Sequence, residues 1–557
     1  MQEDEIKSLL QNDVSAPVSN GITPEILKSL DEIILSGVNE ISVEAYSVYK
    51  KFLPMKSDAP EGMKNELFSA IANYVKEKTE NNEFYDALFL SRFLIVKSDL
   101  KILMFYNIAQ LLLRLNELSL SMYFLKLYDE KETNKPLKYL TLANFYNLEL
   151  KDYKTAITYY EKYTKIDATK SIIYTILASL YSKAYGDIGL KDQIYYFEKA
   201  YHLKPHDRTV LHGLAFAYER LGNKSMSDKF YRELLNNNPT DTDYYNYGLF
   251  LISCGNFIDG HKYFTYRFNI EDSNLKYPLD INTRWNMKSD ISDKVLLVNY
   301  EQGYGDTFMY CRFVPLLTKF ARKIIFRVQD NLVELIKFSG LISDNIEVVS
   351  DIEPFENIKF DVSMALLDAP YVLGINLYEI PYTKGYLTVP QDLAEEYSRK
   401  YIKKSSNLKI GIAYHGDKSA NYNGRDIDVC RFNNLLSIKG ADFYSLQFDS
   451  DIDIEGLSNL SPTFKNFTDT ACAIKNMDLI ISTDNVILNL AGAMGVKTFG
   501  LYNFYPNFRW YQLSGENVGW YESVKPFQVE ENNRWSIVFS KIHNEINDML
   551  KCSVNKN

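Results

Sequence analysis

The stretch Lys294–Arg312, KVLLVNYEQGYGDTFMYCR, constrains the fold more than any other part of the chain. Its apolar run Val295–Val298 is typical of a buried parallel strand, and two glycines follow in the sequence EQGYGD. From Thr307 onward the apolar residues have helical spacing. A strand, a glycine turn and a helix in this order form the unit of an open α/β sheet, whose ligands bind beyond the carboxyl ends of the strands. We therefore expect Glu301–Asp306 to lie at the edge of a cleft.

The carboxylate of Asp306 has two interpretations. An Asp just ahead of a helix can act as an N-cap that accepts hydrogen bonds from unpaired backbone N–H groups. A carboxylate at the edge of a cleft can also act as a general base. Caps of this kind are common, so the spacing by itself favours the cap.

Composition limits the classes of protein to which the chain can belong. Its 557 residues correspond to roughly three or four domain-sized units. A net charge of −10 with no basic stripe argues against a nucleic-acid binder, and a surface rich in tyrosine (43 residues) suits a polypeptide partner. The five cysteines are scattered and never in C-x-x-C spacing, which predicts reduced, buried thiols and neither disulfides nor a metal–thiolate site.

The amino-terminal sequence MQEDEIKSLLQNDVS is acidic and has no apolar core of the kind found in signal peptides. No run in the chain approaches the ~18 apolar residues of a membrane span. These features predict a soluble cytoplasmic protein.

A repeated pair of residues organises the first half of the chain. A small residue is followed three positions later by a large one at Ala109/Leu112, Ala143/Tyr146, Ala178/Tyr181, Ala215/Tyr218 and Gly248/Leu251. The spacing clusters around the ~34-residue period of tetratricopeptide repeats, in which the small residue lets paired helices approach closely. The similarity is good from Ala109 to Phe268 and faint before that; a generic helical bundle is the alternative. We expect an N-terminal helical region at 1–64 and a repeat superhelix with a concave binding surface at 65–268.

The pattern changes after a polar connector at 269–293. Strand-like and helix-like segments then alternate, which implies parallel sheets with helices on both faces. Two such series predict two domains, 294–395 and 396–535, followed by a helix and tail at 536–557. The predicted strands are Val295–Val298, Ile324–Val328, Ile346–Val349, Phe360–Met364, Lys409–Tyr414, Phe443–Phe448, Leu479–Ser482 and Thr498–Leu501.

Two long motifs in this half resemble those of heptosyltransferase-type glycosyltransferases. They are EQGYGDTFMYCRFVPLL at Glu301–Leu317 and DLIISTDNVILNLAGAMGVKTFGLYNFYPNFRW at Asp478–Trp510. The resemblance is greater to the bacterial subgroup in which tetratricopeptide repeats precede the catalytic part. Matching elements are E-Q-G-x-G-D-x-x-x-x-x-R at Glu301–Arg312, a strand end with a downstream Arg at Tyr414–Arg425, D-x-x-x-x-(H/N)-x-A-G-A at Asp484–Ala493, and Phe508–Trp510.

The resemblance covers roughly residues 263–528 and implies an α + α/β chain: a helical repeat superhelix followed by a GT-B glycosyltransferase with two Rossmann-like domains. In this family the C-terminal half holds most of the sugar nucleotide. The chain departs from the family pattern at Asn489, where His is common, and in the loop YHGDKSANYNGRD, where a W-S-G-N form is commoner.

Under this resemblance, Asp306 matches the base that takes the proton from the acceptor hydroxyl in an inverting transfer. This favours the base over the cap, although one carboxylate can serve as both. Glu301 is expected to order the glycine turn or simply to be solvated at the strand end. The predicted cleft turn consists of Glu301, Gln302, Gly303 and Gly305.

The leaving diphosphate needs positive charge and N–H donors, which we expect the protein to supply without a metal or other cofactor. Lys418 and Arg425 are the side-chain candidates, with ordinary surface charges as the alternative. The helix Asn485–Met494 presents its N-terminus to the anion. The sequence DSDI at Asp449–Ile452 lies outside the family motifs and is not expected to bind a metal.

Other donor contacts are expected beyond the strands of the second series. His415 is predicted to bond a phosphate or the sugar, and Gln447 falls where GT-B folds hold the base or ribose. Asp484 is assigned to sugar or ribose hydroxyls or to N-capping, and Asn489 to the donor or the core. The predicted donor-binding set is Tyr414, His415, Lys418, Arg425, Gln447, Asp484, Asn485 and Asn489, with Arg509 and Trp510 at the cleft wall.

These features predict a glycosyltransferase that moves a sugar from a nucleotide-sugar to Ser or Thr of a protein acceptor, such as flagellin or a surface adhesin, held by the repeats. Self-association through the repeats is left open. One alternative is a transferase acting on lipopolysaccharide core or another glycan, against which the repeats argue. The other is a non-catalytic interaction module, for which Asn489 argues and against which Asp306, Arg425 and Asp484 argue.

Overall fold

The computed structural model divides the chain into two compact units, Met1–Val210 and Leu211–Asn557. It describes residues 5–6, 8–10, 22–52, 61–97, 101–270, 277, 279–376, 378–416, 426–448, 453–510, 516–530 and 534–554. The unit boundary therefore falls inside the segment predicted to hold the repeats.

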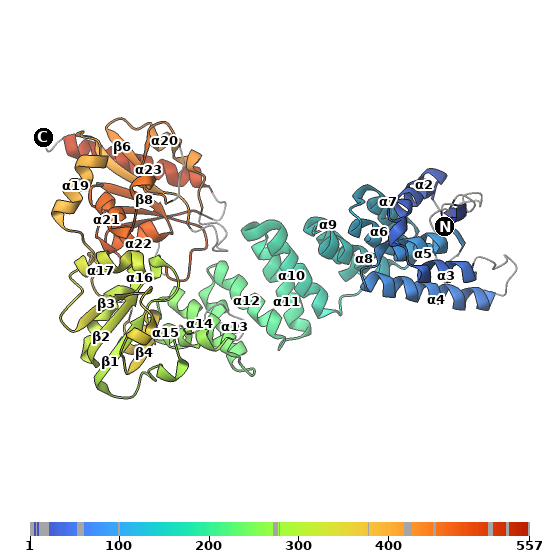
Figure 1. Cartoon of the computed structure of the whole chain (residues 1–557), viewed down its shortest axis with the longest axis horizontal. Coiled ribbons are helices and arrows are strands. Elements are labelled where there is room, and N and C mark those ends of the chain that lie inside the picture. Colours follow the sequence, from blue (N-terminus) through green and yellow to red (C-terminus); the bar gives the residue numbers. More distant parts are fainter. Residues whose placement is uncertain are drawn as a thin grey trace. The chain divides into compact units, whose positions relative to one another are not determined.

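The first unit is helical in its described residues (Figure 1). Its helices are α2 (Pro24–Ser36), α3 (Val43–Phe52), α4 (Glu61–Glu80), α5 (Phe84–Lys97), α6 (Lys101–Arg114), α7 (Leu118–Lys131), α8 (Lys135–Asn144), α9 (Tyr153–Thr164), α10 (Ser171–Tyr185) and α11 (Leu190–Leu203). Consecutive helices pack as the pairs α6/α7, α8/α9 and α10/α11. The predicted small residues Ala109, Ala143 and Ala178 are fully buried. Close packing of α6 on α7 is fixed by Ser121, whose hydroxyl donates to the Ala109 carbonyl at 2.6 Å.

The second unit continues the same pairing. Its first helices are α12 (Arg208–Arg220), α13 (Lys224–Leu235), α14 (Asp241–Ser253) and α15 (Phe257–Phe264). Ser227 donates to the Ala215 carbonyl at 2.9 Å, with the same twelve-residue separation as Ser121 and Ala109. At Gly248 a Cβ atom would lie 2.9 Å from the Gly260 carbonyl oxygen, so glycine is required where α14 meets α15. The predicted small positions thus lie at helix contacts, and the assignment to tetratricopeptide repeats remains a prediction.

A four-stranded parallel sheet follows, with the order β3-β2-β1-β4. Its strands are β1 (Ile291–Asn299), β2 (Ala321–Val328), β3 (Ile346–Ser350) and β4 (Val362–Ala365), close to the predicted ranges. The helix expected after β1 is shorter than predicted: α16 spans Tyr304–Tyr310 and continues as the 3₁₀ segment Cys311–Lys319. Pro315 explains the change, because it lacks the N–H that an α-helix would bond to the carbonyl four residues earlier.

A six-stranded parallel sheet completes the unit, with the order β10-β9-β8-β5-β6-β7. Its strands are β5 (Leu408–Ala413), β6 (Ala441–Ser445), β7 (Leu457–Asn459), β8 (Leu479–Thr483), β9 (Thr498–Tyr502) and β10 (Val524–Gln528). The helices around the two sheets include α17 (Val333–Phe338), α18 (Ala369–Leu373), α19 (Gln391–Tyr401), α20 (Asn433–Leu436), α21 (Phe467–Lys475), α22 (Val486–Ala493) and α23 (Trp535–Val554). The strand order reverses beside β1 in the first sheet and beside β5 in the second, which are the positions where open α/β sheets bind ligands.

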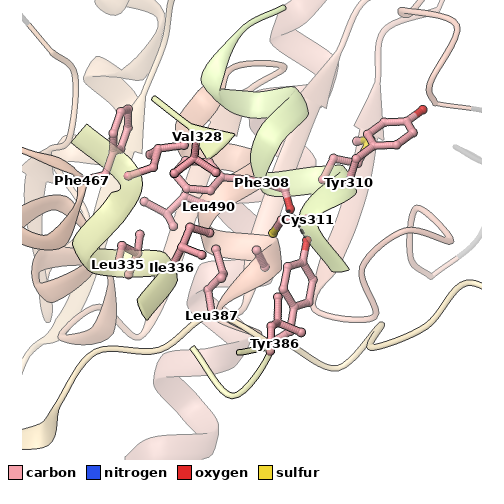
Figure 2. Packing of buried hydrophobic residues seen from close by; sticks show 14 of the residues in the cluster. Phe308, Tyr310, Cys311, Val328, Leu335, Ile336, Tyr386, Leu387, Phe467 and Leu490 are labelled. Carbon is pink, nitrogen blue, oxygen red and sulfur yellow. Dashed lines mark hydrogen bonds between the residues drawn. The ribbon is translucent and has the colours of Figure 1, made fainter. Parts of the chain in front are cut away.

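One buried cluster joins the two sheets to α15. Figure 2 shows the part of this cluster around Phe308, Phe467 and Leu490. Phe308 of α16 packs edge-on against Phe467 of α21 at 5.3 Å between ring centroids, and Leu490 of α22 belongs to the same cluster. Phe257 and Phe264 of α15 belong to the same cluster, which therefore reaches the helices α12–α15 of the second unit, called here the helical segment. Burial of this apolar surface holds the helices α14 and α15 and both sheets together.

Two composition-based expectations can be compared with this fold. All five cysteines are free thiols: Cys311 and Cys472 are buried, Cys254 is intermediate, and Cys430 and Cys552 are exposed. The expectation of buried thiols is therefore wrong for the last two. None of the helices in the described ranges combines the length and apolar character that a membrane span requires.

Candidate active site

A cavity of about 850 Å³ lies at the carboxyl ends of strands from both sheets. Its walls come mainly from the loops after β1, β5, β6 and β8, with further residues from the segments after β2, β7 and β9, and so lie beside the switch points as expected. The volume falls within the ~300–1,000 Å³ of small-molecule sites. The lining residues are Gln302, Gly303, Tyr304, Gly305, Asp306, Met309, Asn331, His415, Gly416, Gln447, Phe448, Lys465, Asn466, Phe467, Asp484, Asn485, Val486, Ile487, Asn489, Asn507 and Arg509.

Asp306 lies in the first turn of α16, and its side chain faces the cavity. The N-cap of this helix is Gly303, which makes no side-chain hydrogen bond, so the cap interpretation of Asp306 is wrong. Its carboxylate instead forms an ion pair with Arg509. Both side chains are largely buried, with 15% and 13% of their surface exposed, which strengthens their electrostatic attraction relative to a surface pair.

Arg509 belongs to the loop after β9 and makes several further contacts. Its guanidinium donates to Gln302 Oε1 at 2.7 Å and to Asn507 Oδ1 at 2.9 Å, and it lies over the Phe508 ring. Gln302 has a φ of 61°, a left-handed conformation that is uncommon for a residue with a side chain. Such strained positions persist where the surroundings fix them, often at functional sites. Arg509 thus connects the loop after β9 to the loop after β1.

The turn between β8 and α22 is built on Asn485. Its side-chain oxygen accepts hydrogen bonds from the amides of Ile487 and Leu488 at 2.9 and 3.2 Å, so Asn485 is the N-cap. The N-capping alternative for Asp484 is therefore wrong, although Asp484 does line the cavity. The dipole of α22 still gives this wall of the cavity a positive potential.

Asn489 joins α22 to neighbouring elements. Its amide donates to the Asn485 carbonyl at 3.1 Å and accepts from the Tyr521 hydroxyl at 3.1 Å. A Cβ atom at Gly305 would lie 3.2 Å from the Asn489 nitrogen, so this glycine permits a close approach of α16 to α22. Asn489 lines the cavity and also contacts the core; its contact with the donor stays a prediction.

The ends of β5 and β6 are held together by Gln447. Its side-chain oxygen accepts from the backbone amides of Tyr414 and His415 at 3.1 and 3.2 Å, and its nitrogen lies 3.2 Å from His415 Nδ1. Gln447 and His415 line the cavity, and their predicted contacts with the donor stay a prediction. Tyr414 does not: its ring is buried and packs edge-on against Phe432, so its side chain belongs to the core. Lys418, Arg425 and Asp449–Ile452 lie outside the described residues.

Several cavity residues were not anticipated from the sequence. Lys465 places an exposed ammonium group at the rim, directly before Asn466, the N-cap of α21. Asn466 accepts from the amides of Thr468 and Asp469 at 2.9 and 3.2 Å, the same arrangement as in α22. An Asn followed by a helical pattern is the only sequence signal at this position. Trp510 does not line the cavity. Its ring is buried against Tyr502, so the expectation that Trp510 forms part of the cleft wall is wrong.

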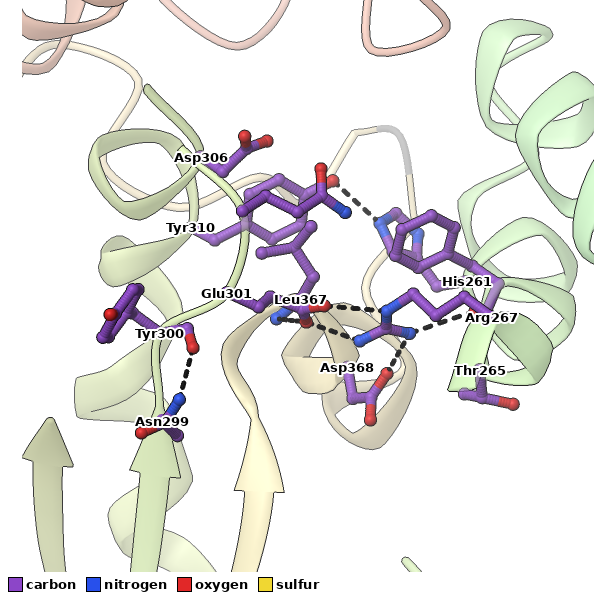
Figure 3. Close-up of polar contacts among 12 residues, drawn as sticks. His261, Thr265, Arg267, Asn299, Tyr300, Glu301, Asp306, Tyr310, Leu367 and Asp368 are labelled. Carbon is purple, nitrogen blue, oxygen red and sulfur yellow. Dashed lines mark hydrogen bonds and ion pairs between the residues drawn. The ribbon is translucent and has the colours of Figure 1, made fainter. Parts of the chain in front are cut away.

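Glu301 departs from its predicted place. It does not line the cavity; its buried carboxylate pairs with Arg267, which donates to its two oxygens at 2.8 and 2.5 Å (Figure 3). Arg267 also donates to Asp368 at 2.7 Å. Burial raises the pKa of Glu301, against the opposing effect of Arg267. Glu301 therefore joins β1 to the end of the helical segment, and solvation at the strand end is wrong.

A buried histidine lies beside this ion-pair cluster. His261 of α15 contacts the Phe257 carbonyl at 2.9 Å and the Tyr310 hydroxyl at 3.3 Å (Figure 3). Burial lowers the pKa of His261 to about 4, so the ring is neutral at pH 7. A neutral ring can donate to the carbonyl from Nδ1 and accept from Tyr310 at Nε2.

Across the described ranges, no three or more His, Cys, Asp or Glu side chains are arranged to hold a metal ion.

Comparisons with known proteins give distant similarities. No family model matches the chain. It is 21% identical over 389 residues to Protein FlbA of Caulobacter vibrioides, an alignment covering 64% of this chain and 64% of that protein. The chain thus spans about 64% of the length of this curated relative.

Two solved structures extend the comparison. The E. coli ADP-heptose LPS heptosyltransferase II is 11% identical, with a TM-score of 0.33, and the similarity covers 46% of this chain and 99% of that one. The Thermobaculum terrenum O-GlcNAc transferase is 12% identical, with a TM-score of 0.27, covering 76% of this chain and 94% of that one. Both of these proteins are glycosyltransferases by their descriptions, and the similarity of this chain to each of them is distant.

Proposed function

We propose that the chain is an inverting, metal-independent glycosyltransferase that moves a sugar from a nucleotide-sugar to a Ser or Thr hydroxyl of a protein. The observation that carries this proposal is the carboxylate of Asp306 in a cavity at the switch points of two parallel sheets. The same cavity contains a helix N-terminus and the cation Arg509. It therefore offers a base and an anion-binding wall within one site.

In the proposed step, the carboxylate of Asp306 takes the proton of the acceptor hydroxyl. The acceptor oxygen forms a bond to the anomeric carbon as the bond from that carbon to the diphosphate breaks, and the nucleoside diphosphate leaves with the electron pair. A single displacement inverts the anomeric configuration. Asp306 ends the step protonated and returns its proton to solvent.

The departing diphosphate gains negative charge that the protein must stabilise. Arg509 provides a guanidinium suited to two phosphate oxygens, Lys465 adds a charge at the rim, and the dipole of α22 acts along the same wall. In the structure Arg509 pairs with Asp306. A bound diphosphate competes for Arg509, and the release of Asp306 from this pair makes its carboxylate available as the base.

The helical pairs supply the proposed acceptor surface. In the first unit, Tyr181 and Tyr196 stack at 5.4 Å between ring centroids, and both hydroxyls donate to Glu161, at 2.7 and 2.8 Å. Tyrosines held in place in this way give contact area to a polypeptide at little cost in conformational entropy. By family resemblance, the acceptor is a flagellin- or adhesin-like surface protein.

The test is a transfer assay with ADP-, UDP-, GDP- and CMP-sugars, host surface protein as the acceptor and intact mass as the readout. We expect one donor to give a discrete mass gain on a polypeptide. Asp306→Asn keeps the shape of the side chain but removes the base, so transfer should fall by ~10²–10⁴-fold while donor binding is kept. Asp344→Asn, in an exposed loop outside the cavity, is the matched control.

Three outcomes would contradict parts of the proposal. Unchanged transfer by Asp306→Asn would remove the base assignment. A mass gain on a glycan in place of a polypeptide would favour the lipopolysaccharide or glycan alternative. The absence of donor binding and of any mass gain over the whole panel would favour a non-catalytic interaction protein.

A further inference from the structure

The loop after β9, residues 503–510, lies between the cavity and the helical segment. Asn507 and Arg509 of this loop line the cavity. Tyr505 of the same loop contacts α12 instead: its ring meets Phe216 edge-on at 6.1 Å between centroids. The loop therefore contacts both the cavity, where the donor is proposed to bind, and the helices, which are proposed to hold the acceptor.

The hydroxyl of Tyr505 is bound by Glu219, also on α12. This carboxyl group accepts two further hydrogen bonds, from Tyr231 on α13 at 3.2 Å and from Ser253 on α14 at 3.4 Å. Burial raises the pKa of Glu219, and the hydrogen bonds from Tyr505, Tyr231 and Ser253 lower it. Glu219 thus accepts hydrogen bonds from hydroxyl groups on two neighbouring helices and on the loop.

Other contacts fix the two ends of the loop. Gln528 of β10 donates to the carbonyls of Asn503 and Phe504 at 3.2 and 2.8 Å. At the far end, the Trp520 indole donates to the Arg509 carbonyl at 2.8 Å. Tyr505 lies between these anchors, so its bond to Glu219 holds the middle of the loop to the helices.

We propose that Tyr505 is a positioning residue that, by binding Glu219, holds the loop in the conformation that presents Arg509 to the cavity. The inference deepens the proposed function and rests on it for its kinetic consequence. The helical segment then does more than hold an acceptor, because it also completes the site for the donor diphosphate. Loss of the bond should loosen the loop without unfolding the sheet beneath it.

Hydrogen exchange measured by mass spectrometry on the intact chain tests the positioning without any substrate. Tyr505→Phe removes the hydroxyl and keeps the ring contact with Phe216. Because the variant loses the hydrogen bond that ties the middle of the loop to α12, we expect exchange in residues 503–510 to become about tenfold faster. The melting temperature should change little. Tyr244→Phe, a ring on α14 that stacks on Tyr263 and Tyr266, is the matched control and should leave the loop unchanged.

Variants at Glu219 separate the hydrogen bond from a general effect on packing. Glu219→Gln keeps an acceptor oxygen and should retain most of the protection of the loop. Glu219→Leu removes the acceptor and should match Tyr505→Phe, and the double variant should be no worse than either single one. Additive effects, or a loop that exchanges at the original rate in Tyr505→Phe, would overturn the proposal.

Transfer kinetics link the loop to the reaction. Tyr505→Phe should raise the donor KM about tenfold and change kcat less, because Arg509 is displaced before the chemical step. If the loop loosens and the original chain transfers no sugar, the proposed function fails while the positioning role stands. If the original chain transfers sugar and the variant has both unchanged exchange and unchanged KM, the positioning role fails by itself.

Discussion

Replacing Arg267 by Met removes the charge at the centre of the buried cluster. The guanidinium is fully buried and donates two hydrogen bonds to Glu301, one to Asp368 and one, at 3.0 Å, to the Phe264 carbonyl. Met fills similar space but leaves Glu301 with the Leu367 amide, at 3.1 Å, as its remaining hydrogen-bond donor among the described residues. A buried carboxylate without its cation is costly.

The expected loss of unfolding free energy is about 3–5 kcal/mol. The hydrogen bonds to charged groups would suggest a larger value at ~1.5–3 kcal/mol each, but the cost of burying the intact ions offsets much of this gain. Arg284→Met is the matched control. Arg284 also pairs with Asp368, at 3.2 Å, but Asp368 keeps its closer pair with Arg267, at 2.7 Å, when Arg284 is removed. No buried carboxylate then loses its last cation, and we expect a loss of about 1 kcal/mol.

Urea unfolding followed by tryptophan fluorescence measures the free energy of unfolding of the second unit, which contains Arg267. All four tryptophans, at positions 285, 510, 520 and 535, lie in the second unit, so the signal reports on that unit and not on the first. Adding Glu301→Gln to Arg267→Met removes the uncompensated charge and should recover part of the loss.

The pH dependence has a defined sign. Burial already raises the pKa of Glu301, and removal of Arg267 raises it further. The native state of the variant then binds a proton more readily than the unfolded state, so its stability rises as the pH falls. We expect the deficit to be smaller at about pH 5 than at about pH 7.5. A loss below about 1 kcal/mol at both pH values, or no recovery in the double variant, would refute the reasoning.

Three shorter predictions follow from other contacts. Burial lowers the pKa of His261 to about 4, so the stabilisation that comes from keeping this ring neutral is complete above pH 6.5 and is lost as the pH falls toward 4. This loss amounts to roughly 3 kcal/mol. In His261→Gln the free energy of unfolding, measured by the same fluorescence assay, should depend less on pH over this range. Gly248→Ala places a Cβ atom 2.7 Å from the Phe264 amide nitrogen and should cost about 1–3 kcal/mol in that assay, and an unchanged midpoint would contradict the close helix contact. Lys465→Ala should raise the donor KM several-fold with little change in kcat, and a fall in kcat at constant KM would place Lys465 in the chemical step.

Periodic patterns made much of the fold predictable. Strands β1 and β8 are short apolar runs bounded by polar residues, and both lie close to their expected positions. The small residues of the helical pairs were found because the same contact recurs along the chain. Strands β7 and β10 were missed because one has three residues and the other contains Pro526, so neither produces a clear pattern.

The candidate site was predictable where residues follow strands and unpredictable where they depend on distant partners. Asp306 and His415 lie at the cavity because the carboxyl ends of parallel strands meet there. Glu301 was misplaced because its partner Arg267 is 34 residues upstream and carries no motif of its own. Similarly, nothing in the sequence around Asp306 indicates that Arg509, more than two hundred residues later, would pair with it.

The location of the cavity beyond the strand ends has a consequence for engineering. The walls that would read the base and sugar belong to loops after β5, β6 and β8, whereas the buried strands contribute backbone pairing and core packing. Loops on a rigid scaffold tolerate exchange far better than the scaffold itself. Under the proposed function, exchange of the segments between these strands should therefore alter donor choice, while Asp306, carried by the other sheet, stays in place.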